Sequence, residues 1–216
     1  MAVFTLGFSC LPRKNLRLLI VLVCLPLAAC TVLPQRPVSQ VWLLPAQPGV
    51  PASGPTINRS LRVMQPSTSQ FINSSRIAVQ PQGAEITVYS GSRWSDSVPV
   101  LFRNRLTQEL RTDGRFISVS SDEDNLQADF ELGGDLSSFQ GVYSDKKGEV
   151  LIQFDARLVQ TSDRRVIASQ RFVIHQPISG SSMSQVVEAF GLASDRLAAD
   201  ILRWLGNSSA MRSPLI

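Results

Sequence analysis

Residues 149–161 read EVLIQFDARLVQT, and this stretch decides the fold. Its apolar and polar side chains alternate, as they do in a strand that is buried on one face only. The apolar set is Val150, Ile152, Phe154, Ala156 and Leu158, and the polar set is Gln153, Asp155 and Arg157. An amphipathic helix would repeat every three or four residues, so this period of two predicts a half-buried β-strand.

Two longer stretches with the same β character flank it, Ala128 to Tyr143 and Val166 to Pro177. The connections contain DKKG at 145–148 and SDRR at 162–165, which are short polar turns that favour antiparallel hairpins. We therefore predict a three-stranded meander. The pair Gly133-Gly134 inside its first strand predicts a bulge or a close approach of another backbone segment.

Further strands are expected upstream of the meander. Short alternating or apolar runs occur at Arg59 to Met64, Arg76 to Gln80, Glu85 to Tyr89 and Phe116 to Val119. An earlier apolar island, Val41 to Leu44, interrupts a proline-rich stretch and is predicted to be a short first strand that docks on the domain. The alternative is a linker without a fixed position.

Two helices complete the pattern. In the first, Ser95-Asp96-Ser97 offers N-cap oxygens and Pro99 fits the first turn. An apolar stripe then follows for about 16 residues, and the helix is expected to end at Asp113-Gly114. The second runs from an N-cap at Ser184 to Gly206. The predicted fold class is α+β: a mixed or mainly antiparallel sheet, with the meander in its C-terminal half and two helices packed on one face.

The N-terminus has the features of a leader. Residues 13–30 read RKNLRLLIVLVCLPLAAC, with basic residues before an apolar core from Leu18 to Leu25, which is too short to span a bilayer. The last four residues resemble the lipobox of bacterial lipoprotein precursors, which implies acylation of Cys30 and removal of residues 1–29. The alternative is an ordinary signal peptide in which Cys30 is incidental.

These features divide the chain into four parts. They are a signal peptide (1–29), a lipidated N-terminus and proline-rich tether with a short strand (30–58), a folded domain (59–206) and a flexible tail (207–216). The ten residues from Cys30 to the first strand reach about 35 Å at most, so the domain stays near its membrane.

Composition excludes several classes of function. The 216 residues carry a formal net charge of +4, which falls to +1 when the three basic residues of the leader are removed, and this gives no support to nucleic-acid binding. One histidine and three cysteines, two of them in the leader, do not assemble a zinc cage. No metal and no cofactor is predicted.

The catalytic inventory is small. His175 could act as a general base only with a nucleophile and an orienting carboxylate, and the sequence contains no Gly-x-Ser-x-Gly elbow, so we interpret it as a surface or structural residue. Asp122 to Asp124 lacks the pattern of a calcium loop and is interpreted as a solvated turn. We predict no catalytic residue and no enzymatic activity.

Four residues are candidates for contact with a partner protein. Arg103, Arg105 and Arg111 lie on or beside the polar side of the first helix, where an acidic partner could dock, and a merely solvated face is the alternative. Trp94 is either a contact anchor or a lid on the local core.

Several short motifs, taken in order, resemble one family. They are Trp42-Leu43-Leu44-Pro45, the strand at Arg76 to Val79, Tyr89 with Arg93-Trp94, Pro99 opening a helix with Leu106 and Leu110, Gly114-Arg115-Phe116, and Ala128-Asp129-Phe130-Glu131-Leu132. Over about residues 39–205 the chain resembles the auxiliary lipoprotein component of ABC-type transporters that act with MCE-domain proteins. Trp42 and Phe130 stand where the family usually has tyrosine.

The resemblance implies a non-catalytic periplasmic subunit of an intermembrane transport system for lipids or other hydrophobic solutes. Its expected partners are an MCE-domain protein and a permease with its ATPase, because the chain itself has no Walker motif. By resemblance to Gram-negative lipoproteins, Thr31 in place of Asp after Cys30 implies the periplasmic face of the outer membrane. Two alternative functions stay open, an outer-membrane assembly lipoprotein (a pilotin or a barrel plug) and an envelope hydrolase. Association into a homo-oligomer is also open.

Overall fold

The predicted meander is present as three long antiparallel strands, β7 (Phe130–Ser144), β8 (Lys147–Gln160) and β9 (Arg165–Pro177). They belong to a computed structural model that describes residues 39–49, 51, 54–145, 147–208 and 211. The leader and Cys30 lie outside the described residues. Every predicted inward residue of β8 is buried, with at most 1% of its surface exposed, which confirms the alternation.

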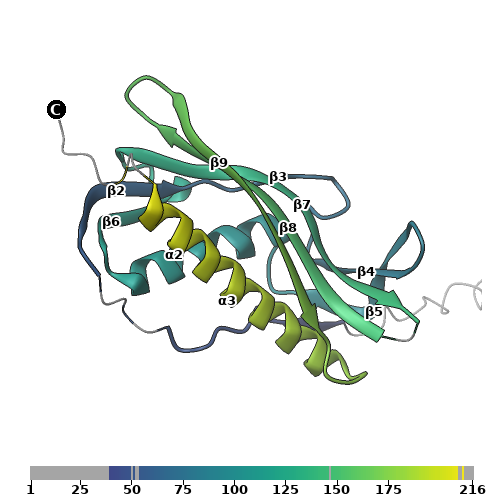
Figure 1. Ribbon diagram of the computed structural model, residues 1–216. Coiled ribbons are helices and arrows are strands. Elements are labelled where there is room, and N and C mark those ends of the chain that lie inside the picture. The colour runs from purple at the N-terminus through teal and green to yellow at the C-terminus, as the bar shows by residue number, and fades with distance from the viewer. Residues whose placement is uncertain (1–38, 50, 52–53, 146, 209–210, 212–216) are drawn as a thin grey trace, which may run out of the picture. The chain divides into compact units, whose positions relative to one another are not determined.

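The other edge of β7 pairs with three strands in succession (Figure 1). All three run parallel to β7, so the nine-stranded sheet is mixed. One end of β7 carries β2 and β6, the other end carries β4, β5 and β1, and β3 lies between them. Their bounds are β1 (Gln40–Trp42), β2 (Ile57–Val63), β3 (Ser67–Thr68), β4 (Arg76–Gln82), β5 (Glu85–Trp94) and β6 (Phe116–Ser121).

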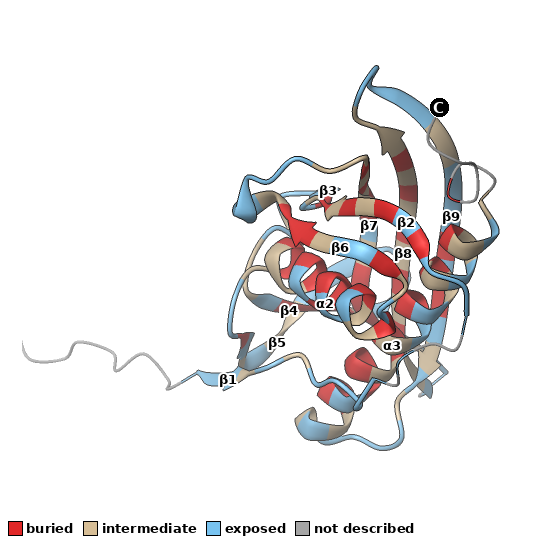
Figure 2. Ribbon diagram, turned by 90° about the vertical axis from the view of Figure 1, so that its left-hand side faces the viewer, coloured by how far each residue is buried: buried red, intermediate tan, exposed pale blue. Residues whose placement is uncertain are grey.

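Helices α2 (Val98–Asp113) and α3 (Met183–Asn207) cover one face of the sheet, as predicted, and Figure 2 shows buried positions along both. The predicted end of α2 is confirmed, because Gly114 follows it with a left-handed φ of 73°. Of the three N-cap candidates Ser97 takes the position, but its side chain forms no capping hydrogen bond. The prediction for α3 is wrong by two residues at its start, because Ser182 is the N-cap and forms a capping box with Gln185.

Aromatic side chains fill the space between the helices and the sheet. The ring of Trp94 meets Phe190 of α3 edge-on, with the centroids 5.2 Å apart, and Phe139 of β7 lies 5.0 Å from Phe190. Phe102 of α2 lies 4.8 Å from Phe154 of β8. Such pairs contribute about 0.5 to 1.5 kcal/mol each beyond their buried area, so they fix the helices in place on the sheet.

Gly134 is a point of close backbone approach, which confirms one of the two predictions for the glycine pair. A Cβ at this position would overlap the carbonyl oxygen of Asp155 and lie 2.9 Å from the ring of Phe154. The bulge lies instead three residues further on, where the β7–β8 register shifts between Leu136 and Ser138. Any larger residue at 134 would therefore push β8 away from β7.

The segment that begins with β1 is fixed to the domain. Strand β1 pairs in parallel with β5, as the docking prediction required. Beyond it, the chain packs closely on both helices. Pro45 lies so near Gly191 of α3 that a Cβ added to this glycine would lie 2.8 Å from the Pro45 carbonyl oxygen. Gly49 is equally close to Thr112 of α2, since a Cβ added to Gly49 would lie 2.6 Å from the threonine side chain. Part of the predicted tether thus packs against both helices.

Asp129 joins the start of β7 to β2. Its carboxylate accepts hydrogen bonds from the backbone N–H and the hydroxyl of Ser60, at 2.7 and 2.8 Å, and its own N–H donates to the Ser60 hydroxyl at 2.9 Å. The backbone hydrogen bond from Ser60, reinforced by the hydroxyl and by Arg59, outweighs burial and lowers the pKa of Asp129. The aspartate of the Ala-Asp-Phe motif therefore has a structural role.

We expect Asp129→Asn to lower the free energy of unfolding by about 1 to 3 kcal/mol at neutral pH, the range for hydrogen bonds to a charged group. Because the folded pKa lies below the ordinary value of 3.8, this stabilisation is present above that value and is lost as the pH falls through the folded pKa. Urea unfolding of both chains between pH 7 and pH 3 measures it. A difference between the two chains that stays constant over this range would contradict the assignment.

Candidate docking surfaces

Trp94 is part of the core. Its side chain is 0% exposed and packs against Phe139 and Phe190, so of the two interpretations of this residue the structure supports the lid on the core. A contact between Trp94 and a partner would require an exposed side chain, so the interpretation of Trp94 as a contact anchor is wrong. The reason is its position at the end of β5, where the alternation of the strand turns it toward the helices.

Arg103 is also buried, with 1% of its surface exposed, and the expected solvated position is wrong. Its guanidinium lies 2.8 Å from the carboxylate of Asp122 and 2.7 Å from that of Glu123, and it donates two hydrogen bonds to Asn104. Burial lowers the pKa of Arg103, but the hydrogen bonds to Glu123 and Asp122 outweigh it and raise the pKa. The predicted solvated turn at 122–124 is thus a short 3-10 helix held to α2 by ion pairs.

The expectation of a side chain that faces solvent or a partner is also wrong for Arg105, because only 6% of its surface is exposed. It forms ion pairs with Asp195 of α3 and, at 3.1 Å, with Glu109 one turn along α2. Burial raises the pKa of Glu109 and Asp195 raises it further, while Arg105 lowers it. The arginine joins the two helices and does not face a partner.

Arg111 keeps its place on the surface, with 54% of its side chain exposed. It lies in a polar hollow of about 470 Å³, lined also by Asn104, Thr107, Gln108, Thr112 and Ser121. Its Nε donates to the carbonyl oxygen of Val119 at 2.9 Å, and its Nη2 lies 3.1 Å from Asp124. Arg111 therefore occupies part of the β6 edge, and partner contact there stays a prediction.

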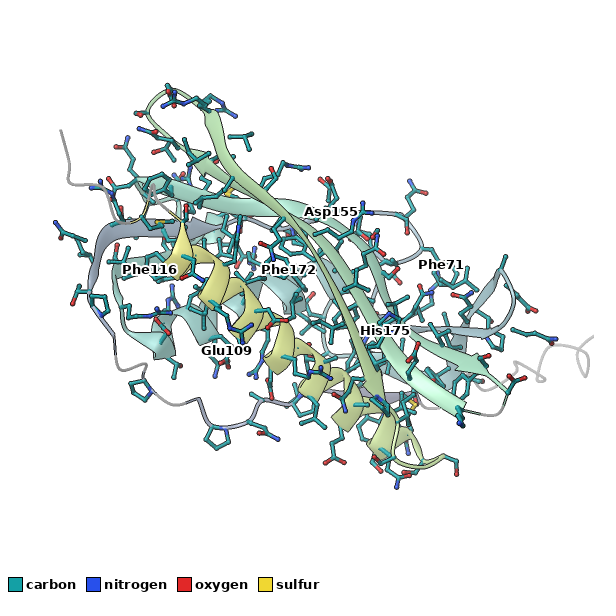
Figure 3. The ribbon with its side chains drawn as sticks, in the orientation of Figure 1. Phe71, Glu109, Phe116, Asp155, Phe172 and His175 are labelled. Atoms are coloured by element: carbon teal, nitrogen blue, oxygen red, sulfur yellow. The ribbon has the colours of Figure 1, made fainter. Side chains whose placement is uncertain are left out.

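His175 lies on the outer face of β9, with 55% of its side chain exposed and its Nδ1 2.8 Å from Glu149 Oε1 (Figure 3). No hydroxyl or thiol is a hydrogen-bond partner of its ring among the described residues. Within the same part of the chain, no three histidine, cysteine or carboxylate side chains cluster as metal ligands. The described residues thus give His175 a carboxylate partner but no nucleophile to activate.

A groove between β9 and α3 was not predicted from the sequence. It has a volume of about 470 Å³ and is lined by Gln170, Arg171, Phe172, Val173, Asp200, Arg203, Trp204 and Asn207. Phe172 and Trp204 of this lining meet edge-on, with their ring centroids 5.8 Å apart. Strand β9 pairs only with β8 among the described strands, so the groove runs beside an open strand edge.

The direction of the free backbone groups of β9 follows from two hydrogen bonds. The N–H of Ile178 donates to Gly148 of β8, so residue 178 and the even-numbered residues before it point toward β8. The carbonyl of His175 accepts from Arg196 of α3, on the other side. The N–H and C=O groups of Ser169, Arg171 and Val173 therefore point to the open edge.

The outer face of the meander is a ladder of ion pairs. Arg171 lies 2.6 Å from Asp155, and Arg157 lies 2.5 Å from Asp135. The hydrogen bond from Arg171 is the main cause that lowers the pKa of Asp155, against the opposing effect of burial. The cations of this face are neutralised by neighbours on adjacent strands, which is typical of a solvated sheet surface.

Comparison with known families gives one match. Residues 42–202 match the profile of the family described as the ABC-type transport auxiliary lipoprotein component. These residues include all the described strands after β1 and most of α3. Within the described part of the chain, neither helix is both long and apolar enough to cross a bilayer. No curated protein matched the chain.

Two solved structures share the fold. A protein from Xanthomonas campestris superposes with a TM-score of 0.71 at 24% identity, over 77% of this chain and 94% of that one. An uncharacterized protein superposes with a TM-score of 0.63 at 16% identity, over 78% and 99%. At these identities the likeness concerns the arrangement of strands and helices only.

We expect Arg103→Met and Arg111→Met to differ in their effect on stability. The first change removes a buried guanidinium and leaves Asp122 and Glu123 without their cation, so unfolding should cost about 1 to 3 kcal/mol less. The second removes an exposed pair and should change stability by less than about 1 kcal/mol. Urea unfolding followed by tryptophan fluorescence compares them. An effect of Arg103→Met as small as that expected for Arg111→Met would show that Arg103 has no structural role.

Proposed function

We propose, from the premise that this chain belongs to the family of ABC-type transport auxiliary lipoprotein components, that it is a periplasmic, non-catalytic subunit of an MCE-linked transport system. The observation that carries the proposal is the family match, which spans nearly the whole folded part of the chain. The substrate class implied by the resemblance is lipid or another hydrophobic solute. The energy would come from a separate ATPase.

The proposed anchor is a set of acyl chains on Cys30 at the outer membrane. The support is the lipobox-like sequence Leu27-Ala28-Ala29-Cys30 and the threonine that follows it. Each buried CH₂ of an acyl chain contributes about 0.8 kcal/mol, so several chains make release from the bilayer rare. The anchor would hold the domain at the membrane while it binds the rest of the transport assembly.

The proposed docking site is the open edge of β9, and its occupant is an extended segment of the MCE-domain partner. A strand added there would pair with the outward N–H and C=O groups of Ser169, Arg171 and Val173, in the manner of β-strand addition. The groove beside this edge would receive every second side chain of the added strand. The charges at its rim, Arg203 and Asp200, form an ion pair at 2.8 Å, so the groove favours an uncharged segment.

Other described edges are less open than β9. The β6 edge is partly occupied by Arg111, and β1 spans only three residues. In contrast, β9 spans 13 residues, and Arg196 covers it at the His175 end. Exposed long edges promote unwanted pairing unless they have a partner or a protecting residue. A strand of the partner, paired with the remaining length of β9, would protect this edge.

Acylation is tested by Cys30→Ser. We expect the parent chain to fractionate with the outer membrane and to carry acyl chains by mass spectrometry, and we expect the variant in the soluble periplasmic fraction. Thr31→Asp is the matched control, since it keeps the thiol and should move the acylated chain to the inner membrane. A soluble, unmodified parent chain would overturn the anchor.

Docking is tested by Val173→Pro, which removes one outward N–H without breaking the ladder to β8; proline is tolerated on edge strands. We expect about a tenfold loss in the recovery of the MCE-domain protein from cross-linked envelopes, the effect of one backbone hydrogen bond. Val173→Thr is the control, because it keeps the N–H and a β-branched side chain. Unchanged recovery with a folded proline variant would move the docking site elsewhere, and recovery of a β-barrel instead would favour the assembly-lipoprotein alternative.

A further inference from the structure

Two arginines lie directly opposite each other on the neighbouring strands β4 and β5. Arg76 of β4 is the registered partner of Arg93 of β5, and both side chains are exposed. Their sequence neighbours Ile77 and Trp94 are each 0% exposed, so the arginines point to the outer face, away from the helices. Like charges in directly opposed positions destabilise a sheet unless an anion neutralises them.

Neither arginine forms an ion pair with any of the described residues, unlike the paired cations of the meander. The nearest polar acceptor of Arg93 is the backbone carbonyl of Trp94, at 3.5 Å from Nη1. The guanidinium of Arg76 lies over the ring of Phe71, 5.6 Å from its centroid. These contacts orient the two cations, but within the described part of the chain they leave the positive charge without a counterion.

Exposed apolar side chains adjoin the arginines. Val41 of β1 is the registered partner of Arg93 in a parallel pair, so it shares the outer face, and 52% of its surface is exposed. Leu43, two residues later, is 74% exposed. We call Val41, Leu43, Phe71, Arg76 and Arg93 the Arg76–Arg93 patch. Cations beside exposed apolar side chains match the phosphate and glycerol layers of a bilayer surface.

We propose that the Arg76–Arg93 patch binds the phosphate groups of anionic lipids in the membrane to which the chain is anchored. The proposal rests on the proposed acylation of Cys30, which lies ten residues before Gln40 and so holds β1 within about 35 Å of the bilayer. The arginines contact the headgroups while Val41 and Leu43 enter the interfacial layer. This contact fixes the orientation of the domain, which a flexible tether alone would leave free.

The test uses the mature chain with Cys30→Ser, so its outcome does not depend on acylation. Binding is measured by sedimentation with vesicles of phosphatidylcholine alone and with about 30 mol % phosphatidylglycerol. We expect binding to the anionic vesicles, and at least a tenfold loss in the double variant R76Q/R93Q. The matched control R157Q/R171Q removes two cations of the same face that are ion-paired, and it should change binding by less than about threefold.

Three outcomes would show that the patch does not recognise lipid phosphates in a bilayer. Millimolar inorganic phosphate should not compete with the vesicles; if it does, the patch is a free-anion site and the proposal fails. Equal losses in both double variants would mean that net charge alone explains the binding, and this would overturn the proposal. Loss of MCE-protein recovery in the acylated R76Q/R93Q chain, with vesicle binding unchanged, would assign the patch to a protein partner instead.

Folding of the variants is checked independently. Because R76Q/R93Q removes an unfavourable pair of like charges, we expect its urea midpoint to equal or exceed that of the parent chain. L43S leaves both arginines in place and should weaken binding to the anionic vesicles by about threefold or more, through the apolar contribution alone. Failure of vesicle binding together with normal acylation of Cys30 would refute the patch and leave the proposed anchor intact.

Discussion

The pairing of β7 on both of its edges is the constraint on which the rest of the structure depends. One edge is paired with β8 along almost its whole length, and the other receives β2, β3 and β4 in succession. The register with β8 is pinned where the backbone of Asp155 crosses Gly134, since no side chain fits between them. A slip of one residue would turn Leu132 and Leu136 toward solvent, so the register and the core specify each other.

The sequence predicts best those strands and helices that are determined by their own residues, without contacts from distant segments. Strand β8 has its own alternation, and α2 has a cap, a proline in its first turn and a C-terminal glycine. The first strand of the meander was harder, because the bulge after Leu136 resets the alternation and lets Phe139, three residues later, also point inward. The parallel pairing of β2, β3 and β4 with β7 had no local signal, since it depends on contacts between segments far apart in the chain.

The arginines of α2 show why charge patterns locate surface sites poorly. Arg103 and Arg105 flank the apolar stripe, where a sequence alone predicts solvent. Their burial depends on carboxylates 19 and 90 residues away, Asp122 and Asp195, which the sheet and α3 bring to them. The β9 groove had a weak signal: β9 is the last strand, it ends the meander, and its residues 169–171 are polar. The Arg76–Arg93 pair could not be predicted from the sequence, because the two residues are seen to be partners only when the register between β4 and β5 is known.

The two proposed surfaces lie toward opposite edges of one sheet. A continuous run of paired strands leads from β1 through β5, β4, β7 and β8 to β9. With about 4.8 Å between neighbours, the five spacings separate the two edges by about 24 Å. If Cys30 carries the proposed anchor, the chain leads from it into β1, and a bilayer on that side would leave the open edge of β9 accessible to a partner. If one edge served both, membrane and partner would compete for it, whereas the width of the sheet would keep the two proposed contacts independent.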